Sequence, residues 1–348
     1  MQNWALQQEL MSMGHVPVTI DVYRKYPYFR WLMTSLRLKV DNFLGRNDLI
    51  VPDKPIRGRC INPITAPFIF ENINMSPPYY TLNSELLIRE KLDCIIVGSD
   101  QVWRPRYNPH LKEMFLDFAR GANIKRISYA ASFGSEEWEM DDEQTEVCRQ
   151  LIHEFDGVSV REISGVDLCK QHFGIDAVCV LDPTMLIDEE LYFGLCDGNK
   201  RTISEKPFLA FYCLDFSEKK QKIAEQIAQN KNLEIRKFSA GPNLKLSVSE
   251  WLDTIRRAAY VLTDSFHGTV FAILFEKDFM TVFNKKRGGA RFRSLFESLN
   301  IKGHVMTEDD FWKDNERECV DWCVVKQNLN KLKRQSHDFL YQSINTNA

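Results

Sequence analysis

Short apolar runs rich in β-branched and aromatic residues alternate with longer segments of helical periodicity along most of this 348-residue chain. Strands that are separated by helices need crossover connections, and these pair the strands in parallel. The alternation therefore predicts an α/β fold built on parallel sheets. The expected strands are residues 94–98, 126–131, 157–161, 177–182, 208–214, 234–239, 260–264 and 280–284.

Two windows between these runs show a clear amphipathic stripe. Residues 145–155 place Val147, Leu151 and Phe155 on one helical face, and residues 291–299 repeat this pattern with Phe and Leu. An apolar stripe at this spacing is typical of a helix that packs on a sheet. We therefore expect both windows to be helices that cover the predicted sheets.

The expected strands fall into two sets, which the polar stretch 198–206 separates. This division predicts two Rossmann-like domains, residues 1–198 and 199–323, with a cleft between them. Residues 324–348 are expected to form a helix that packs back across the junction. The segment 23–80 is rich in aromatic residues and prolines, and we expect it to be a helical and loop insertion in the first domain.

Charge and hydropathy exclude several classes of protein. The 45 Lys and Arg nearly balance the 48 Asp and Glu, whereas a dedicated nucleic-acid binder would carry a positive excess. The longest apolar stretch, 258–275, contains Asp264 and His267, so no integral membrane segment is expected. The N-terminus shows no secretion signal, and the nine scattered cysteines contain no CxxC pair. We expect a cytoplasmic protein that binds neither nucleic acid nor metal.

Small and polar residues follow the expected strands, although the strands themselves are apolar. Ligands of open parallel sheets bind outside the carboxyl ends of the strands. If the carboxyl edges of the two sheets face each other, these residues line one cleft between the domains. The segments concerned are 98–103, 132–134, 161–162, 182–184, 264–269 and 284–289.

His267 is the strongest catalytic candidate. It follows an expected strand and opens an apolar helix, for which Asp264 or Ser265 is a suitable N-cap. The N-terminus of a helix favours bound anions, so a histidine there can donate a proton to an anionic substrate. The structural alternative is that His267 only hydrogen-bonds a strand carbonyl. The Asp-Ser-x-His-Gly setting favours the functional interpretation.

Two charged residues that end strands are further candidates. Arg161 is either an anion clamp or one half of a structural ion pair with Glu162 or Asp182, and its position at the end of an apolar strand favours the clamp. Asp100 either caps the next helix or binds and deprotonates a sugar hydroxyl, and the residues alone leave these two roles open. Trp103 is expected to belong to the core.

A basic run follows the expected strand 280–284 and its last residue, Asn284. Lys285, Lys286, Arg287, Arg291 and Arg293 place five positive charges within nine residues. Such runs are usually solvated surface, but this one borders the expected cleft, which favours a phosphate-binding role with Arg287 as its main member. Ser132 lies outside any G-x-S-x-G motif and is expected to donate a hydrogen bond. G-x-G-x-x-G and Walker motifs do not occur in the sequence.

Five ordered motifs resemble those of the polysaccharide pyruvyl transferase family, and the resemblance covers the chain from about residue 3 to about residue 299. The motifs are DCIIVGSDQVW (93–103), SYAASFG (128–134), VSVRE (158–162), LDPT (181–184) and TDSFHGT (263–269). The resemblance implies a fold like that of GT-B glycosyltransferases. It also implies transfer of a pyruvyl group from phosphoenolpyruvate, as co-substrate, to a sugar, with a pyruvate ketal and phosphate as products.

On this basis His267 is the expected general acid, which protonates the methylene carbon of phosphoenolpyruvate. Substrate contacts are expected from residues that end strands or lie in the basic run. These are Asp100, Ser132, Arg161, Asp264, Ser265, Asn284, Lys285 and Arg287. No metal and no further cofactor is implied.

Two departures from the family pattern bear on these expectations. Members of the family usually begin with a strand and an Asn-Tyr-Gly-type loop, whereas this chain starts in the following helix, at Trp4 to Leu10. We therefore expect the first strand of the N-terminal domain to be missing. Some members carry Arg-Leu-His where this chain has Ser265, Phe266 and His267, so another cation, Arg287 or Lys285, would have to supply the charge of that arginine.

Two other functions fit the same features. One is a glycosyltransferase that uses a nucleotide sugar, whose diphosphate would suit the cleft and the basic run. The other is a catalytically inactive protein that binds glycans or anions. The acceptor of a pyruvyl transferase would be a sugar or a lipid-linked oligosaccharide, and the second would bring the protein into peripheral contact with the inner membrane face.

Overall fold

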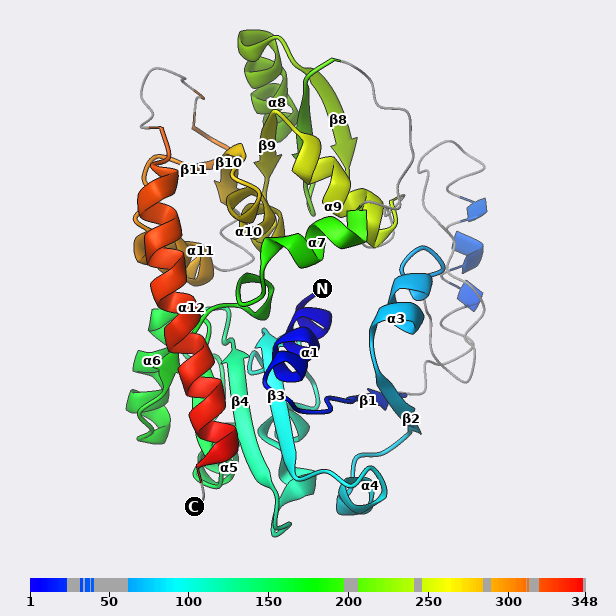
Figure 1. Ribbon diagram of the computed structural model, residues 1–348, viewed down its shortest axis with the longest axis vertical. Coiled ribbons are helices and arrows are strands. Elements are labelled where there is room, and N and C mark those ends of the chain that lie inside the picture. The colour runs from blue at the N-terminus through cyan, green and yellow to red at the C-terminus, as the bar shows by residue number, and fades with distance from the viewer. Residues whose placement is uncertain are drawn as a thin grey trace.

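The computed structural model describes residues 1–23, part of 32–40, and residues 62–196, 206–240, 246–283, 289–310, 312 and 319–346. Two larger parallel sheets lie one above the other in the elongated molecule (Figure 1). All strand pairs in the described part of the chain are parallel. The predicted α/β class is therefore confirmed.

The first large sheet has four strands in the order in which they occur in the sequence, β3-β4-β5-β6. Its strands are β3 (Cys94–Asp100), β4 (Lys125–Ala131), β5 (Gly157–Val160) and β6 (Val178–Cys179). The last strand is shorter than the predicted 177–182. It ends before Asp182 because this side chain caps a turn of 3-10 helix at Pro183–Met185.

The second large sheet has five strands in the order β11-β10-β9-β7-β8. Its strands are β7 (Phe208–Tyr212), β8 (Glu234–Phe238), β9 (Tyr260–Thr263), β10 (Asp278–Phe283) and β11 (Val305–Thr307). All residues of β7 and β9 are buried, which explains why these strands are continuous apolar runs. The sequence analysis did not predict β11, which has only three residues.

A small two-stranded sheet pairs β1 (Thr19–Val22) with β2 (Met75–Tyr79). This pair was not predicted, and helices and loops were expected over 23–80, because Pro77 and Pro78 remove the strand pattern from β2. Helix α3 (Ala66–Asn72) fits the expected insertion. The rest of this prediction, which falls on most of 24–61, lies outside the described residues.

Helices cover both faces of the five-stranded sheet. Leu209 and Phe211 of β7 pack with α8, whereas the alternate residues Ala210 and Tyr212 share a core with α9 and α10. Side chains of a strand point alternately to its two faces, so one apolar run fills two cores. The helices are α1 (Gln2–Ser12), α3 (Ala66–Asn72), α4 (Ser84–Arg89), α5 (Asp142–Ile152), α6 (Ile163–Leu168), α7 (Glu189–Cys196), α8 (Glu218–Lys231), α9 (Val248–Arg257), α10 (Phe266–Leu274), α11 (Ala290–Leu299) and α12 (Trp322–Asn345).

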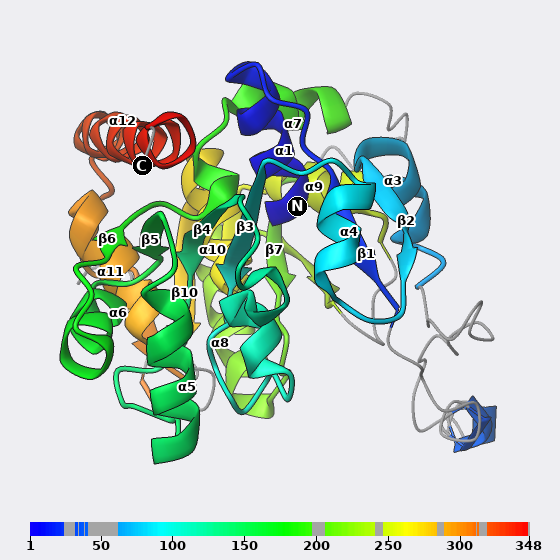
Figure 2. The same cartoon turned by 90° about the horizontal axis from the view of Figure 1, so that it is seen from below.

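The long helix α12 runs beside both large sheets, from α11 to β4 (Figures 1 and 2). Ser336 of α12 accepts a hydrogen bond from the backbone N–H of Leu181 at 2.9 Å, directly before Asp182. Lys333 donates one to the carbonyl of Ile187 at 3.0 Å. The helix thus holds the turn after β6 in place. The division at residue 198 lies in 197–205, outside the described residues, and stays a prediction.

Candidate functional site

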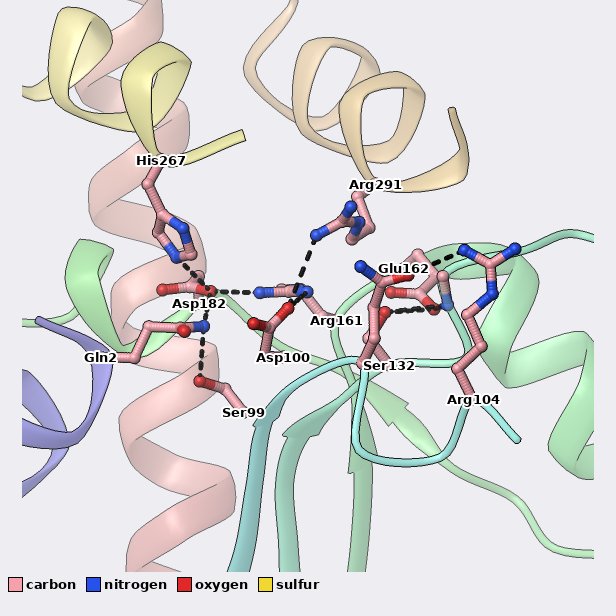
Figure 3. Close-up of polar contacts among 12 residues, drawn as sticks. Gln2, Ser99, Asp100, Arg104, Ser132, Arg161, Glu162, Asp182, His267 and Arg291 are labelled. Carbon is pink, nitrogen blue, oxygen red and sulfur yellow. Dashed lines mark hydrogen bonds and ion pairs between the residues drawn. The ribbon is translucent and has the colours of Figure 1, made fainter. Parts of the chain in front are cut away.

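Charged side chains from the ends of both large sheets meet in one cluster (Figure 3). Asp100 ends β3, Arg161 follows β5, and Asp182 lies after β6. His267 and Arg291 lie in the first turns of α10 and α11, the helices that follow β9 and β10. We call these five residues the charged cluster. They come from positions 100 to 291 of the sequence, so the fold alone brings them together.

Arg161 lies at the centre of the cluster, and its side chain is only 2% exposed. Its Nη1 donates a hydrogen bond to Oδ2 of Asp182 at 2.7 Å, and its Nη2 donates one to Oδ1 of Asp100 at 3.0 Å. Burial acts to lower the pKa of Arg161, but the two carboxylates outweigh it and raise the pKa above its ordinary value. Of the two roles predicted from the sequence, the structure shows the ion pair, while contact with a substrate anion stays a prediction.

Asp182 is fully buried and holds several groups at once. Its Oδ1 accepts hydrogen bonds from the backbone N–H and the hydroxyl of Thr184, at 3.1 and 2.7 Å. Its Oδ2 accepts hydrogen bonds from Arg161 and from the amide of Gln2, both at 2.7 Å. Burial alone would raise its pKa, but His267 and Arg161 lower the pKa far below the ordinary range. Asp182 is therefore ionised at neutral pH.

The ring of His267 lies between this carboxylate and solvent. Its Nε2 is 3.6 Å from Oδ2 of Asp182, an ion-pair distance longer than a hydrogen bond, and the side chain is 27% exposed. The ring is therefore reachable from solvent while it faces a fixed negative charge. This arrangement differs from the structural alternative of a histidine that bonds only to a strand carbonyl.

The start of α10 is built to bring His267 close to the sheet. Ser265 is the N-cap, as expected, because its hydroxyl accepts a hydrogen bond from the N–H of Gly268 at 3.3 Å. A Cβ at Gly268 would lie 2.3 Å from the hydroxyl oxygen of Thr263, so only glycine allows this approach. The Asp-Ser-x-His-Gly pattern therefore has a packing reason as well as a chemical one.

Asp100 lies at the solvent side of two arginines. Its Oδ1 is 3.0 Å from Nη2 of Arg161 and 3.6 Å from Nη1 of Arg291. Its side chain is 52% exposed, whereas that of Arg291 is only 8% exposed. Burial would raise the pKa of Asp100, but Arg161, His267 and Arg291 lower it. Burial and the nearby Arg161 lower the pKa of Arg291 to about 10, so it remains a cation at neutral pH.

Both guanidinium groups also pack on one aromatic ring. The Cζ atoms of Arg161 and Arg291 lie 4.9 and 5.3 Å from the ring centroid of Phe266. Phe266 itself is buried and contacts the ring of Phe292 edge to face. Stacking of this kind favours a cation by electrostatic attraction to the ring face. Phe266 thus holds two positive groups on the side of the cluster that the C-terminal sheet provides.

Ser132 and Asp264 are held by internal contacts. The Ser132 hydroxyl donates to Oε1 of the buried Glu162 at 2.9 Å, which agrees with its predicted role as a hydrogen-bond donor. The carboxylate of Asp264 accepts hydrogen bonds from the N–H of Leu214 and from Nζ of Lys220, both at 2.6 Å. Ser265 is 4% exposed and caps α10. Substrate contact by these three residues stays a prediction.

Three candidates from the basic run cannot be placed. Asn284, Lys285 and Arg287 lie in 284–288, outside the described residues. Arg293 of the same run is 60% exposed and pairs with Glu136 across the two sheets at 2.8 Å. Trp103, expected in the core, is fully buried and stacks on Phe115 with ring centroids 4.8 Å apart.

Asp182 was predicted as a partner of Arg161 and as part of the cleft-lining segment 182–184, but not as a substrate contact, and Arg291 was placed in the basic run without being chosen. The available signal for Arg291 was its position beside Phe292 at the start of an amphipathic helix that follows a strand. Gln2, whose amide contacts Asp182 and Ser99, carried no such signal. A polar residue at the start of the chain does not reveal which distant side chain it meets.

Unsatisfied polar atoms also gather at this place. Among the described residues, Nε of Arg161, Oε2 of Glu162 and Nε2 of His267 are buried and lack a hydrogen-bond partner. Native proteins satisfy nearly all buried polar groups with protein atoms, water or ligands. These three atoms are therefore candidates for contact with water or with a polar ligand.

Ligands of parallel α/β folds bind outside the carboxyl ends of the strands, and the charged cluster lies at that place in both large sheets. The family model of polysaccharide pyruvyl transferases matches residues 1–284, and the chain belongs to this family. Its members are transferases of polysaccharide biosynthesis, which agrees with the resemblance seen in the five motifs. No curated protein sequence matches the chain.

Solved structures with a similar arrangement are distant in sequence. UDP-GlcNAc 2-epimerase from Methanocaldococcus jannaschii, in complex with UDP-GlcNAc and UDP, is 13% identical with a TM-score of 0.42 and covers 90% of this chain and 99% of its own. UDP-N-acetylglucosamine 2-epimerase from Rickettsia bellii is 9% identical with a TM-score of 0.45 and covers 99% and 95%. A glycosyltransferase from Rickettsia africae is 11% identical with a TM-score of 0.44 and covers 95% of each chain.

Proposed function

We propose that this protein transfers the pyruvyl group of phosphoenolpyruvate to a sugar, with a cyclic pyruvate ketal and phosphate as products. The observation that carries the proposal is the position of His267. Its side chain is 27% exposed, its Nε2 lies 3.6 Å from the ionised Asp182, and it belongs to a cluster with two buried arginines. Membership of the polysaccharide pyruvyl transferase family supports the same reaction.

The donor carries a carboxylate and a phosphate, so its site needs fixed cations. Arg161 and Arg291 supply two guanidinium groups, both packed on Phe266. Guanidinium groups bind carboxylates and phosphates through paired hydrogen bonds. The nine-residue helix α10 points its N-terminus toward the same cluster, which adds a favourable field for an anion. Arg291 is a further cation beside Arg287 and Lys285, which lie outside the described residues and whose predicted role stays a prediction.

The chemistry begins with a proton transfer from His267 to the methylene carbon of the donor. The adjacent carbon C2 then becomes electrophilic, and a sugar hydroxyl oxygen forms a bond to it. The C2–O bond to phosphate breaks, and a second hydroxyl of the sugar closes the ketal. One hydroxyl proton replaces the proton that His267 gave, and the other leaves with phosphate. A positioned acid of this kind contributes about 100- to 10,000-fold in rate.

Replacement of the acid tests the proposal. His267→Ala should abolish phosphate release from phosphoenolpyruvate in the presence of a panel of envelope oligosaccharides and their lipid-linked precursors, while binding of the donor remains measurable. His110→Ala is the matched control, because the His110 side chain is 48% exposed and pairs with Glu113 of its own turn. Wild-type turnover by His267→Ala would show that the acid is another group.

The identity of the donor is tested separately from catalysis. A ligand that binds only the folded protein raises its melting temperature, and the rise grows with ligand concentration. Phosphoenolpyruvate should raise the melting temperature, whereas UDP-sugars at the same concentration should not. The opposite result would favour a glycosyltransferase. Stabilisation by phosphoenolpyruvate without phosphate release from any acceptor would favour an inactive anion-binding protein.

The acceptor is a sugar of a polysaccharide or of its lipid-linked precursor. A lipid-linked acceptor would bring a cytoplasmic protein into peripheral contact with the inner face of the membrane. None of the helices in the described part of the chain is long and apolar enough to span a bilayer.

A further inference from the structure

The carboxylate of Asp100 lies at the mouth of the charged cluster, between two positive groups. Its Oδ1 is 3.0 Å from the guanidinium of Arg161 and 3.6 Å from that of Arg291. The arginine side chains are 2% and 8% exposed, and that of Asp100 is 52% exposed. An anion that approaches the two guanidinium groups from solvent therefore meets Asp100 first.

Arg161 does not need Asp100 as its counter-ion. The fully buried Asp182 already pairs with Arg161 at 2.7 Å, and it is held there by Thr184 and Gln2. Asp182 thus neutralises Arg161 on its buried side, whereas Asp100 pairs with both arginines on the side that faces solvent. The outer position is where an incoming anion would gain the most from the two positive charges, because a guanidinium group binds carboxylate and phosphate oxygens in the same geometry.

We propose that the Asp100 carboxylate occupies the place between Arg161 and Arg291 that an anionic group of the donor takes, and that donor binding displaces it. This inference rests on the proposed function for the identity of the donor, but not for the location of the anion site. Asp100 is then an internal counter-ion, and the anion that binds must compete with it.

The backbone at Asp100 is fixed, so the displacement is a side-chain rotation. Its carbonyl accepts hydrogen bonds from the N–H of Val102 at 2.8 Å and of Ser132 at 2.9 Å. Its φ of 72° lies in the left-handed region, where an aspartate is uncommon and which asparagine also tolerates. The displaced carboxylate remains at the solvent side of the cluster, where the acceptor must enter. Its rotation would therefore expose, only after the donor has bound, a proton acceptor that relays one sugar hydroxyl proton to the departing phosphate.

The proposal makes a prediction that a simple binding role for Asp100 does not make. Loss of the carboxylate should tighten the binding of the donor while it slows turnover. Asp100→Asn removes the charge, keeps the shape and suits the left-handed backbone, so the variant should fold. We expect the dissociation constant for phosphoenolpyruvate to fall about tenfold, which corresponds to about 1.4 kcal/mol. We expect kcat to fall as well, because the proton acceptor is lost.

Inorganic phosphate is the second probe, measured by isothermal titration calorimetry with the full chain. It should also bind Asp100→Asn more tightly than the wild type, whether or not the protein turns over phosphoenolpyruvate. Asp176→Asn is the control for net charge, because Asp176 is 85% exposed and pairs with Lys170 on the surface. It should leave both dissociation constants unchanged.

The outcomes separate the two proposals. If Asp100→Asn binds phosphate more tightly but the wild type does not turn over phosphoenolpyruvate, the counter-ion role of Asp100 is supported and the pyruvyl transfer is rejected. Turnover of phosphoenolpyruvate by the wild type, with unchanged or weaker anion binding by Asp100→Asn, would reject the counter-ion and leave the reaction standing. If neither protein binds phosphate or phosphoenolpyruvate, the anion site itself is rejected.

Discussion

Asp182 and His267 join the two large sheets at their carboxyl edges. The carboxylate follows β6 of the first sheet, and the imidazole Nε2 lies 3.6 Å from it in the first turn of the helix after β9 of the second. The same carboxylate accepts a hydrogen bond from Arg161 at 2.7 Å. One buried charge therefore orients both His267, the proposed acid, and Arg161, which we propose to bind phosphoenolpyruvate. The site therefore depends on the relative position of the two sheets, and α12 contacts both α11 and, through Ser336 and Lys333, the turn after β6.

Neutralisation of Asp182 should destabilise the fold in a pH-dependent way. Its pKa lies far below the ordinary value because His267 and Arg161 outweigh the effect of burial. A depressed carboxyl pKa stabilises the folded state above the unfolded pKa of about 4, and this contribution is lost as the pH falls below it. Asp182→Asn should therefore lower the free energy of unfolding at pH 7 by about 3 kcal/mol, since it leaves Arg161 without its buried partner.

Urea unfolding of both proteins between pH 3 and pH 7 measures this effect. The difference between wild type and Asp182→Asn should be largest at neutral pH and should narrow below about pH 4. Asp176→Asn, on the surface, should show no such dependence. A difference that is constant over this range would mean that Asp182 stabilises the fold by shape and hydrogen bonding, and not by charge.

Removal of the Arg161 charge should affect both stability and donor binding. Arg161→Gln leaves Asp182 buried and without its cation, and the loss of one partner of a buried ion pair costs about 3–5 kcal/mol. Arg120→Gln is the control, because Arg120 is 59% exposed and its pair with Glu154 should be worth about 1 kcal/mol or less. Among molecules that remain folded, the Michaelis constant for phosphoenolpyruvate should rise, and an unchanged value would move the anion site elsewhere.

Arg291 should contribute to donor binding with less effect on the rate of the chemical step. Hydrogen bonds to charged groups are worth about 1.5–3 kcal/mol, so Arg291→Gln should raise the Michaelis constant for phosphoenolpyruvate about 10- to 100-fold. Arg293→Gln, on the same helix, provides the comparison, because Arg293 is 60% exposed and pairs with Glu136. Equal steady-state constants for the two variants would assign Arg291 a purely structural role.

The strands of the large sheets could be predicted because they are buried on both faces. The runs at 208–214 and 260–264 are continuous apolar segments, and β7 and β9 lie within them. The pair β1–β2 and the edge strand β11 were missed, since prolines or a length of three residues remove the pattern that burial would create. A periodic apolar pattern arises where side chains are buried, and few side chains of these three strands are buried.

Only the site residues that directly follow a predicted strand could be found from the sequence. Asp100, Arg161 and His267 follow apolar runs, and the rule that ligands bind at carboxyl ends was enough to select them. The sequence does not show which charges meet in space. Asp264 was predicted as a substrate contact and Asp182 was not, but the carboxylate of Asp264 pairs with Lys220 of α8, whereas Asp182 belongs to the charged cluster. Selection between the two requires the direction of each side chain, which depends on tertiary packing.

The glycine after His267 gives a prediction about the position of the proposed acid. A Cβ at Gly268 would lie 2.3 Å from Oγ1 of Thr263 and 2.9 Å from the ring of Tyr212, both fixed by the sheet, so Gly268→Ala must move the start of α10. Overpacking of this kind costs about 1–3 kcal/mol.

Gly194→Ala is the matched control, because nothing lies within 4 Å of a Cβ at Gly194, which is inside helix α7. It should stabilise the protein by about 0.5–1 kcal/mol. Phosphate release should fall in Gly268→Ala even at temperatures where the variant is fully folded, because His267 no longer faces the donor carbon. Wild-type activity in that variant would show that the position of α10 is not critical for the proton transfer.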